Sequence, residues 1–475
     1  MSHIRSLISH SKNYFFAEIA IKALAFIAIP VYTRLLSVEE YGVFNVFLAT
    51  AGFFSVILSL STETAVSRYY YDTKDETDFK KFVGTSSRIT FFVFIFTTIL
   101  FLFFTNLFCE WLNFSTILVW AIVPYSALQI VNSFFLQIYT PLMKSKKIAI
   151  ISSLRTYSAF LISVIFIMFL FKSEKYYGQI LGYLITYLLF SIVLINNIKK
   201  YYIPSFDRKY VKYILSFAVP QIPYYLSGII ISQIGRLIIN SYDGFANAGI
   251  YSFASNIAAL MLVVISVGHS AWNPYYFKYM NSKDYSSCSK DFNLIWKVTL
   301  IIALFLSSFS FELGALIGTK DYLSQLNMVP FFILGYIFYQ WSYVYLRNIM
   351  FSRKTIWSSV VVFISGFSSI LFSIMFYNLL GRWAVVFAFV ASYFVMFIVS
   401  YAINKYVLKL YSVRVFDLLK PLIIYFVFLL FLYFTYIQTN ITGIMLFVLK
   451  LIICFLFTAI MMYPYYNYKY YRLNK

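Results

Sequence analysis

Charged residues are scarce in this 475-residue sequence, and acidic ones are the scarcest. Charged side chains make up 12% of the chain, about half of the roughly 25% usual in soluble proteins, whereas 61% of residues are hydrophobic. Apolar runs of about 20 residues recur throughout, and each can cross a hydrocarbon core of about 30 Å as a helix. This excludes a water-soluble enzyme and a disordered chain. Because barrel strands are about 10 residues of alternating polarity, the runs predict an all-α polytopic membrane protein instead.

Cysteine and histidine are too few and too scattered to predict a metal site. Cys109, Cys288 and Cys454 lie in separate segments without metal-ligand or disulfide spacing, and the chain has three histidines. The glycine-containing stretch 314–320 does not have the spacing of a nucleotide-binding loop. We therefore expect no metal, no cofactor, no ATP hydrolysis and no catalytic residue.

The apolar runs predict fourteen membrane spans. The first run carries Glu18 and Lys22 and lacks a small-residue cleavage site, so we expect a retained helix rather than a signal peptide. The expected spans are 13–34, 42–66, 89–108, 115–139, 148–171, 177–198, 213–238, 248–272, 292–315, 327–349, 356–378, 383–404, 418–437 and 442–463.

Basic residues alternate between the two sides of these spans. The chain has 38 Lys and Arg against 17 Asp and Glu, for a net charge of +21. With a cytoplasmic N-terminus, 28 basic residues fall in or at the edge of inner segments and five at the outer side. Because cytoplasmic loops attract Lys and Arg, the count predicts that both termini are cytoplasmic, and the dispersal of the basic residues among short loops predicts no nucleic-acid partner.

Two short motifs recur at similar offsets, which predicts an internal repeat. The stretch 33–36 followed by 41–44 resembles 235–238 followed by 248–251, and 143–147 resembles 350–354. The offsets are 202 at the two arginines and 207 for the second pair, and both pairings match helices of the same orientation. The expected parts are a six-helix lobe at 1–200, a second at 201–405, and an appended helix pair with a basic, Tyr-rich tail at 406–475. Parallel lobes of this kind usually enclose a cavity that alternates access.

The first motif, from Ile29-Pro30-Val31-Tyr32-Thr33-Arg34 to Tyr41-Gly42-Val43-Phe44, resembles the first-helix signature of polysaccharide flippases. These belong to the multidrug/oligosaccharidyl-lipid/polysaccharide exporter superfamily. The stretch 233–254 is similar to their seventh-helix signature. One departure is Gly235, where family members often have an acidic residue, so no ion pair or proton coupling is carried over to this position.

The resemblance implies translocation of undecaprenyl-diphosphate-linked oligosaccharide, such as an O-antigen repeat unit, from the cytoplasmic to the periplasmic leaflet of the bacterial inner membrane. It also implies alternating access and a place beside the polymerase and chain-length proteins of the same pathway. Such a transporter makes no covalent bonds, but it must stabilise a diphosphate and hydrated sugars inside the membrane.

Basic residues within or at the ends of spans are therefore the candidate diphosphate-binding groups, because buried charges in spans usually face a polar pathway. They are Lys22, Arg34, Arg155, Arg236 and Lys450. Snorkelling to the headgroups is the alternative for the arginines, and a fold-specific hydrogen bond is the alternative for Lys450. Lys22 also follows Glu18 by one helical turn, so the two form a candidate ion pair that specifies packing.

Uncharged polar residues in spans are candidate sugar contacts, although interhelical hydrogen bonding explains any single one equally well. They are Gln129, Asn132, Gln137, Gln233, Asn256 and Gln340. Pro220 and Pro223 remove backbone donors within one span and predict a hinge there.

Two other functions stay open at this stage. A cation-coupled small-molecule exporter has the same fold, but its cavity needs acidic residues, and the spans hold few. A membrane polysaccharide polymerase needs a sizeable outer loop that bears Arg, Asp or His. The expected outer loops are short, and each has at most two basic residues.

Overall fold

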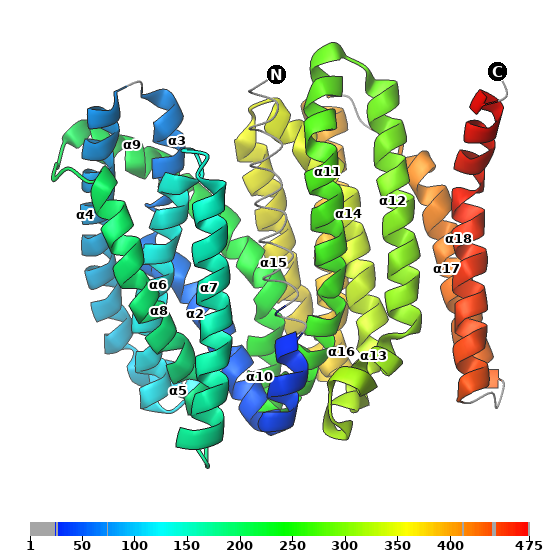
Figure 1. Cartoon of the computed structure of the whole chain (residues 1–475), viewed down its shortest axis with the longest axis horizontal. Helices are drawn as coiled ribbons and strands as arrows, with labels where there is room; N and C mark the ends of the chain where they lie inside the picture. The colour runs from blue at the N-terminus through cyan, green and yellow to red at the C-terminus, as the bar shows by residue number, and fades with distance from the viewer. Residues whose placement is uncertain (1–23, 25–26, 74, 411–412, 439–442, 474–475) are drawn as a thin grey trace. The chain divides into compact units, whose positions relative to one another are not determined.

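The structure is a computed structural model that describes residues 24, 27–73, 75–410, 413–438 and 443–473. Within these residues every regular element is helical, which confirms the all-α polytopic membrane fold (Figure 1). The chain divides into two compact units, residues 1–252 with 317–321 and residues 253–316 with 322–475. The expected lobe boundaries at 200 and 405 describe the sequence repeat, whereas this division describes which helices pack together. The lobes therefore stay a prediction.

The first unit is built from helices joined by short turns. They are α2 (Val38–Ser59), α3 (Thr64–Asp72), α4 (Glu76–Phe103), α5 (Thr105–Leu112), α6 (Thr116–Tyr139), α7 (Ser145–Ile165), α8 (Tyr176–Ile198), α9 (Arg208–Ala218) and the greater part of α10 (Ile222–Ala258). A π-helical turn at Phe166–Leu170 extends α7. Helix α6 packs against α2 and α8, and α8 packs in turn against α7.

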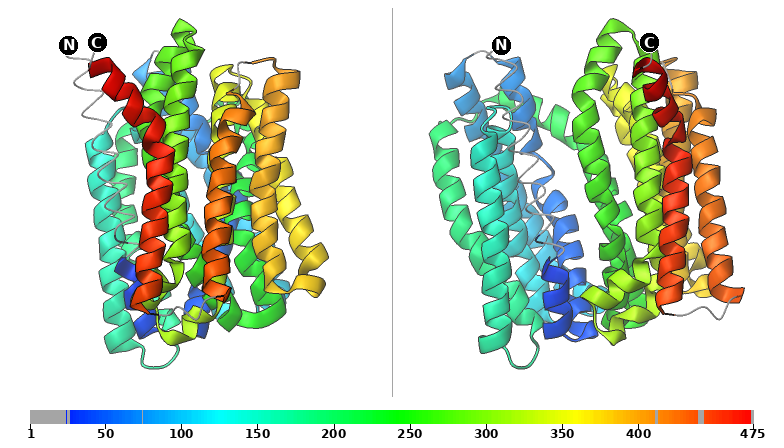
Figure 2. Two further views of the ribbon diagram at one scale, coloured as in Figure 1. Left: turned by 90° about the vertical axis from the view of Figure 1, so that its right-hand side faces the viewer. Right: turned by 45° about the vertical axis from the view of Figure 1, so that its right-hand side comes forward.

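The second unit contains the remaining helices. They are α11 (Leu260–Ser282), α12 (Tyr285–Ser308), α13 (Ser310–Ile317), α14 (Val329–Phe351), α15 (Thr355–Leu380), α16 (Arg382–Ala402), α17 (Val415–Gln438) and α18 (Ile444–Leu473). Helix α16 packs against α14 and α15, and α12 packs against α11 and α14. The appended helices α17 and α18 both pack on α12, and Figure 2 shows them running side by side.

Eleven helices among the described residues are long and apolar enough to cross a membrane. One continuous run, from Arg208 to Ser282, covers two of the expected spans. Helix α14 matches the expected span 327–349 but is not among the eleven, and most of the span 13–34 lies outside the described residues.

The expected span 42–66 is two helices. Ser37 and Glu40 form a capping box that starts α2 at Val38, earlier than expected. Leu60 and Ser61 have φ angles of 47° and 53°, and this left-handed pair ends the helix. Thr62 replaces a lost helical bond, because its hydroxyl donates to the Ser59 carbonyl at 2.9 Å.

Two glycines allow α2 and α10 to cross at very close range. A methyl group on Gly42 would lie 1.9 Å from the carbonyl oxygen of Phe245, and one on Gly249 would lie 2.2 Å from that of Val38. Gly42 and Gly249 are 207 residues apart, as are Val38 and Phe245. The contact is therefore symmetric with respect to the repeat expected from the sequence.

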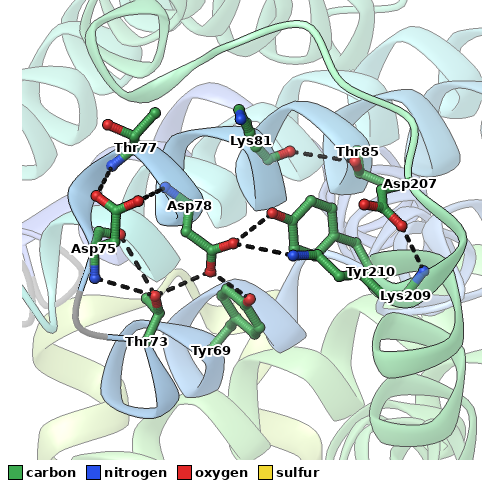
Figure 3. A network of polar contacts seen from close by, with 10 residues as sticks. All are labelled: Tyr69, Thr73, Asp75, Thr77, Asp78, Lys81, Thr85, Asp207, Lys209 and Tyr210. Atoms are coloured by element: carbon green, nitrogen blue, oxygen red, sulfur yellow. Dashed lines mark hydrogen bonds and ion pairs between the residues drawn. The ribbon is translucent and has the colours of Figure 1, made fainter.

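Helix α9 is attached to α3 and α4 through two carboxylates. The Tyr213 hydroxyl donates to Asp72 at the end of α3, and the second carboxylate is that of Asp78 (Figure 3). The Asp78 carboxylate accepts hydrogen bonds from the hydroxyls of Tyr69 and Tyr210, both at 2.6 Å, and of Thr73 at 3.0 Å. Lys209 completes the network with an ion pair of 3.4 Å. Burial, together with the hydrogen bond to Asp78, raises the pKa of Tyr69.

Candidate functional site

Arg155 on α7 is the predicted cation with the most distinctive surroundings. Its guanidinium lies 4.7 Å from the ring centre of Tyr187 on α8, and Tyr187 stacks on Tyr125 of α6 at 5.6 Å. The side chain is half-buried, and its Nε has no hydrogen-bond partner among the described residues. A guanidinium that lies over a ring face can still donate from the N–H groups at its edge, which makes Arg155 a candidate anion-binding group.

A polar face of α6 lies in the same unit. Gln129, Asn132 and Gln137 are half-buried, and at about 100° per residue they lie on one side of the helix together with Ser133. This arrangement brings the three predicted sugar contacts of α6 onto one surface.

Glu63 adjoins this polar face and is missing from the residues predicted as a site. Its side chain is 6% exposed, and one carboxylate oxygen accepts a hydrogen bond from the Ser133 hydroxyl at 3.1 Å. The other oxygen has no hydrogen-bond partner within the described part of the chain. The break between α2 and α3 places this carboxyl group in the interior, and a continuous helix does not predict it.

The other predicted arginines are engaged by neutral oxygen atoms. Arg34 donates to the carbonyls of Pro30 at 2.8 Å and Ile317 at 3.4 Å. Arg236 donates to the side-chain oxygen of Gln233. Gln233 thus contacts a predicted cation.

Lys450 has an acidic partner in the second unit. Its ammonium lies 2.6 Å from a carboxylate oxygen of Glu312 on α13, and its side chain is 13% exposed. Because the pair neutralises the charge, this geometry favours a role in attaching α18 over diphosphate binding.

Gln340 belongs to a polar ladder between α14 and α11. The residue is fully buried, and its side-chain oxygen lies 2.5 Å from Nε2 of His269. Tyr343 stacks on the His269 ring and donates to Asn273 at 2.9 Å. The amide nitrogen of Gln340 has no hydrogen-bond partner among the described residues, so a sugar contact stays a prediction beside interhelical hydrogen bonding.

The remaining predicted residues fall into three groups. Glu18 and Lys22 lie outside the described residues. Asn256 is half-buried near the end of α10. A 3₁₀ turn at Val219–Gln221 contains Pro220 and separates α9 from α10, and Pro223 lies in the first turn of α10. Among the residues that the structure describes, no group of three or more His, Cys, Asp or Glu side chains could hold a metal ion.

Comparisons with known proteins show the family to which the chain belongs. The family model described as "Polysaccharide biosynthesis protein" matches residues 13–280, more than half of the chain. "Lsg locus putative protein 1" of Haemophilus influenzae is 25% identical over 373 residues, which cover 73% of this chain and 87% of that protein. An "Uncharacterized membrane protein" of the same organism is 26% identical over 361 residues, which cover 70% and 84%.

Solved structures show the same fold. The structure titled "Lipid II flippase MurJ, inward closed conformation" is similar with a TM-score of 0.72 and 17% identity, covering 97% of this chain and 99% of that one. An inward-facing multidrug resistance transporter of the MATE family matches with a TM-score of 0.60 and 14% identity over 82% and 97%. The chain belongs to the polysaccharide biosynthesis protein family.

Proposed function

We propose that this protein translocates undecaprenyl-diphosphate-linked oligosaccharide repeat units, such as those of O-antigen, across the bacterial inner membrane by alternating access. The family and fold are those of flippases and related transporters. To this family and fold the proposal adds the cargo and the membrane. It also adds the orientation, with both termini cytoplasmic, and it names the polymerase and chain-length proteins as partners in the same pathway.

The observation that carries the proposal is the Arg155 site. A half-buried guanidinium, in the same unit as the glutamines and asparagine of α6, suits a cargo that joins an anion to sugars. The α2–α10 glycine contact supports alternation, because a close-packed crossing without intervening side chains is a natural place for helices to separate.

The test is transport by purified protein in proteoliposomes. Vesicles loaded on one leaflet with a polyprenyl-diphosphate oligosaccharide should show protein-dependent exposure of the sugar on the other leaflet. An otherwise identical polyprenyl lipid without phosphate should be left in place. Transport of both lipids would remove the diphosphate from the proposal, and transport of neither would contradict translocation itself.

Glu63 favours one second candidate, a cation-coupled exporter of small molecules. A buried carboxylate whose second oxygen has no partner among the described residues can take up a proton or a metal cation. The same vesicles can be loaded with a fluorescent organic cation. Cation-driven export of this probe, without movement of the lipid, would establish the exporter in place of the flippase.

A further inference from the structure

The loop between α6 and α7 forms a basic hollow that the proposed transport cycle does not use. It encloses about 550 Å³, and its lining includes Met143, Lys144, Lys146, Lys147 and Ile150. Three lysines are thus among the residues that line one small space. A hollow of this size has room for the head of a phospholipid.

The lysines of the hollow have only neutral partners in the described structure. Lys144 donates to the Tyr201 hydroxyl, and Lys147 donates to the side-chain oxygen of Asn197. Both ammonium groups also lie over the ring of Tyr139, at 5.4 and 5.1 Å from its centre.

No carboxylate lies within 4 Å of these lysines in the described part of the chain. Lys200 adds further repulsion at Lys147. Like charges held this close without a counter-charge are stabilised by an anion.

An apolar stripe leads away from the hollow along α7. Ile150, Leu154, Leu161 and Ile165 are 48%, 55%, 56% and 48% exposed, and their spacing places them on one helix face. At 1.5 Å per residue the stripe is about 22 Å long, which exceeds the roughly 15 Å hydrocarbon depth of one leaflet. Exposed apolar side chains of this kind contact acyl chains.

We infer that this hollow binds the phosphate of an anionic phospholipid, with the lipid's acyl chains lying along the α7 stripe. The lysines neutralise the phosphate, and Met143 and Ile150 contact the start of the chains. Basic pockets at the cytoplasmic ends of membrane helices bind anionic headgroups by this chemistry, and the charge distribution predicts that this loop is cytoplasmic.

A second hollow in the same unit supplies a matched control. It encloses about 590 Å³ and is bordered by Arg88, Phe91, Phe92 and Phe206. The phenylalanines are exposed, so this hollow is also continuous with an apolar surface, but Arg88 is the only basic residue in its lining. The two hollows differ mainly in charge.

The test is titration of the purified full-length protein with phosphatidylglycerol, followed by native mass spectrometry at low salt. Each basic residue near an anionic lipid changes binding by about fivefold, so K144Q/K146Q/K147Q should weaken it about 100-fold. K144R/K146R/K147R should bind like the native protein. R88Q should change binding about fivefold at most.

Three results would overturn the inference. The first is equal binding of phosphatidylglycerol by the native and triple-Gln proteins, and the second is equally tight binding of zwitterionic phosphatidylethanolamine. The third is a triple-Gln protein that loses only polyprenyl diphosphate, which would assign the hollow to a transported lipid. If the triple-Gln protein does not fold, the single variant K146Q tests the inference, because Lys146 is exposed and its replacement should not affect folding. We expect K146Q to weaken phosphatidylglycerol binding about fivefold.

Discussion

At the scale of single residues, Arg155 is the group whose loss should affect transport most directly. R155A removes a charged donor worth about 1.5–3 kcal/mol, so we expect transport to fall at least about tenfold at unchanged membrane abundance. R155K keeps the charge but not the planar fork, and it should retain part of the activity. Proteoliposome transport and quantitative blotting measure both effects.

The matched control for Arg155 is R353A, because Arg353 is exposed in the turn before α15. R353A should transport at the native rate. If R155A transports normally, or if R155A protein is absent from the membrane, Arg155 has a structural role.

Glu63 makes a prediction about stability. A buried carboxylate with one unsatisfied oxygen costs free energy, and the neutral amide of E63Q removes the charge while keeping the Ser133 contact. We expect E63Q to be as stable as the native protein or up to about 2 kcal/mol more stable, measured by thermal unfolding in detergent. A clear loss of stability would show that the carboxylate has a cationic partner.

At the residue scale, sequence reasoning selected polar and charged side chains in apolar runs. Arg155 and the polar residues of α6 were selected in this way, and their roles stay predictions. Lys450 was also found, but its partner Glu312 is 138 residues away, and only the tertiary structure brings the two together. Glu63 was not selected because its position depends on the left-handed turn at Leu60 and Ser61.

At the scale of elements, the Asp78 network should determine how firmly α9 is attached. D78N removes a charged acceptor that serves three hydroxyls and Lys209, so it should destabilise the protein by about 1–3 kcal/mol. Thermal unfolding would measure the effect. E39Q is the control, since Glu39 is exposed, and a D78N protein as stable as E39Q would show that the network contributes little.

The α2–α10 crossing makes a prediction about gating. G42A and G249A add methyl groups where carbonyl oxygens lie 1.9 and 2.2 Å away, so the helices must separate. We expect both variants to lose most transport and to expose a cysteine introduced at Val46, on the same face of α2, to an impermeant maleimide. The measurement uses a protein whose three native cysteines are replaced by serine.

The crossing has matched controls on the same helices. Gly52 on α2 and Gly228 on α10 have open space where a methyl group would lie, so G52A and G228A should transport normally and keep the probe protected. If G42A and G249A behave like these controls, the crossing has no role in gating.

At the scale of the whole molecule, hydropathy and charge alternation were enough to predict an all-α membrane protein. The motifs beginning at Thr33 and Gly235 were enough to predict the family, because they combine helix ends with close-packing glycines. The division into compact units could not be predicted, because it depends on which helices pack together. It places the chain as far as Ser252, beyond the sixth expected span, with the first unit.

The central claim is that the protein carries lipid-linked oligosaccharide between leaflets. The most direct measurement is the leaflet on which the repeat unit accumulates when the protein is depleted from its own cells. We predict that the unit is trapped on the cytoplasmic leaflet, unpolymerised, and that surface glycan is lost. A unit that still reaches the periplasmic leaflet, or normal surface glycan, would contradict the account.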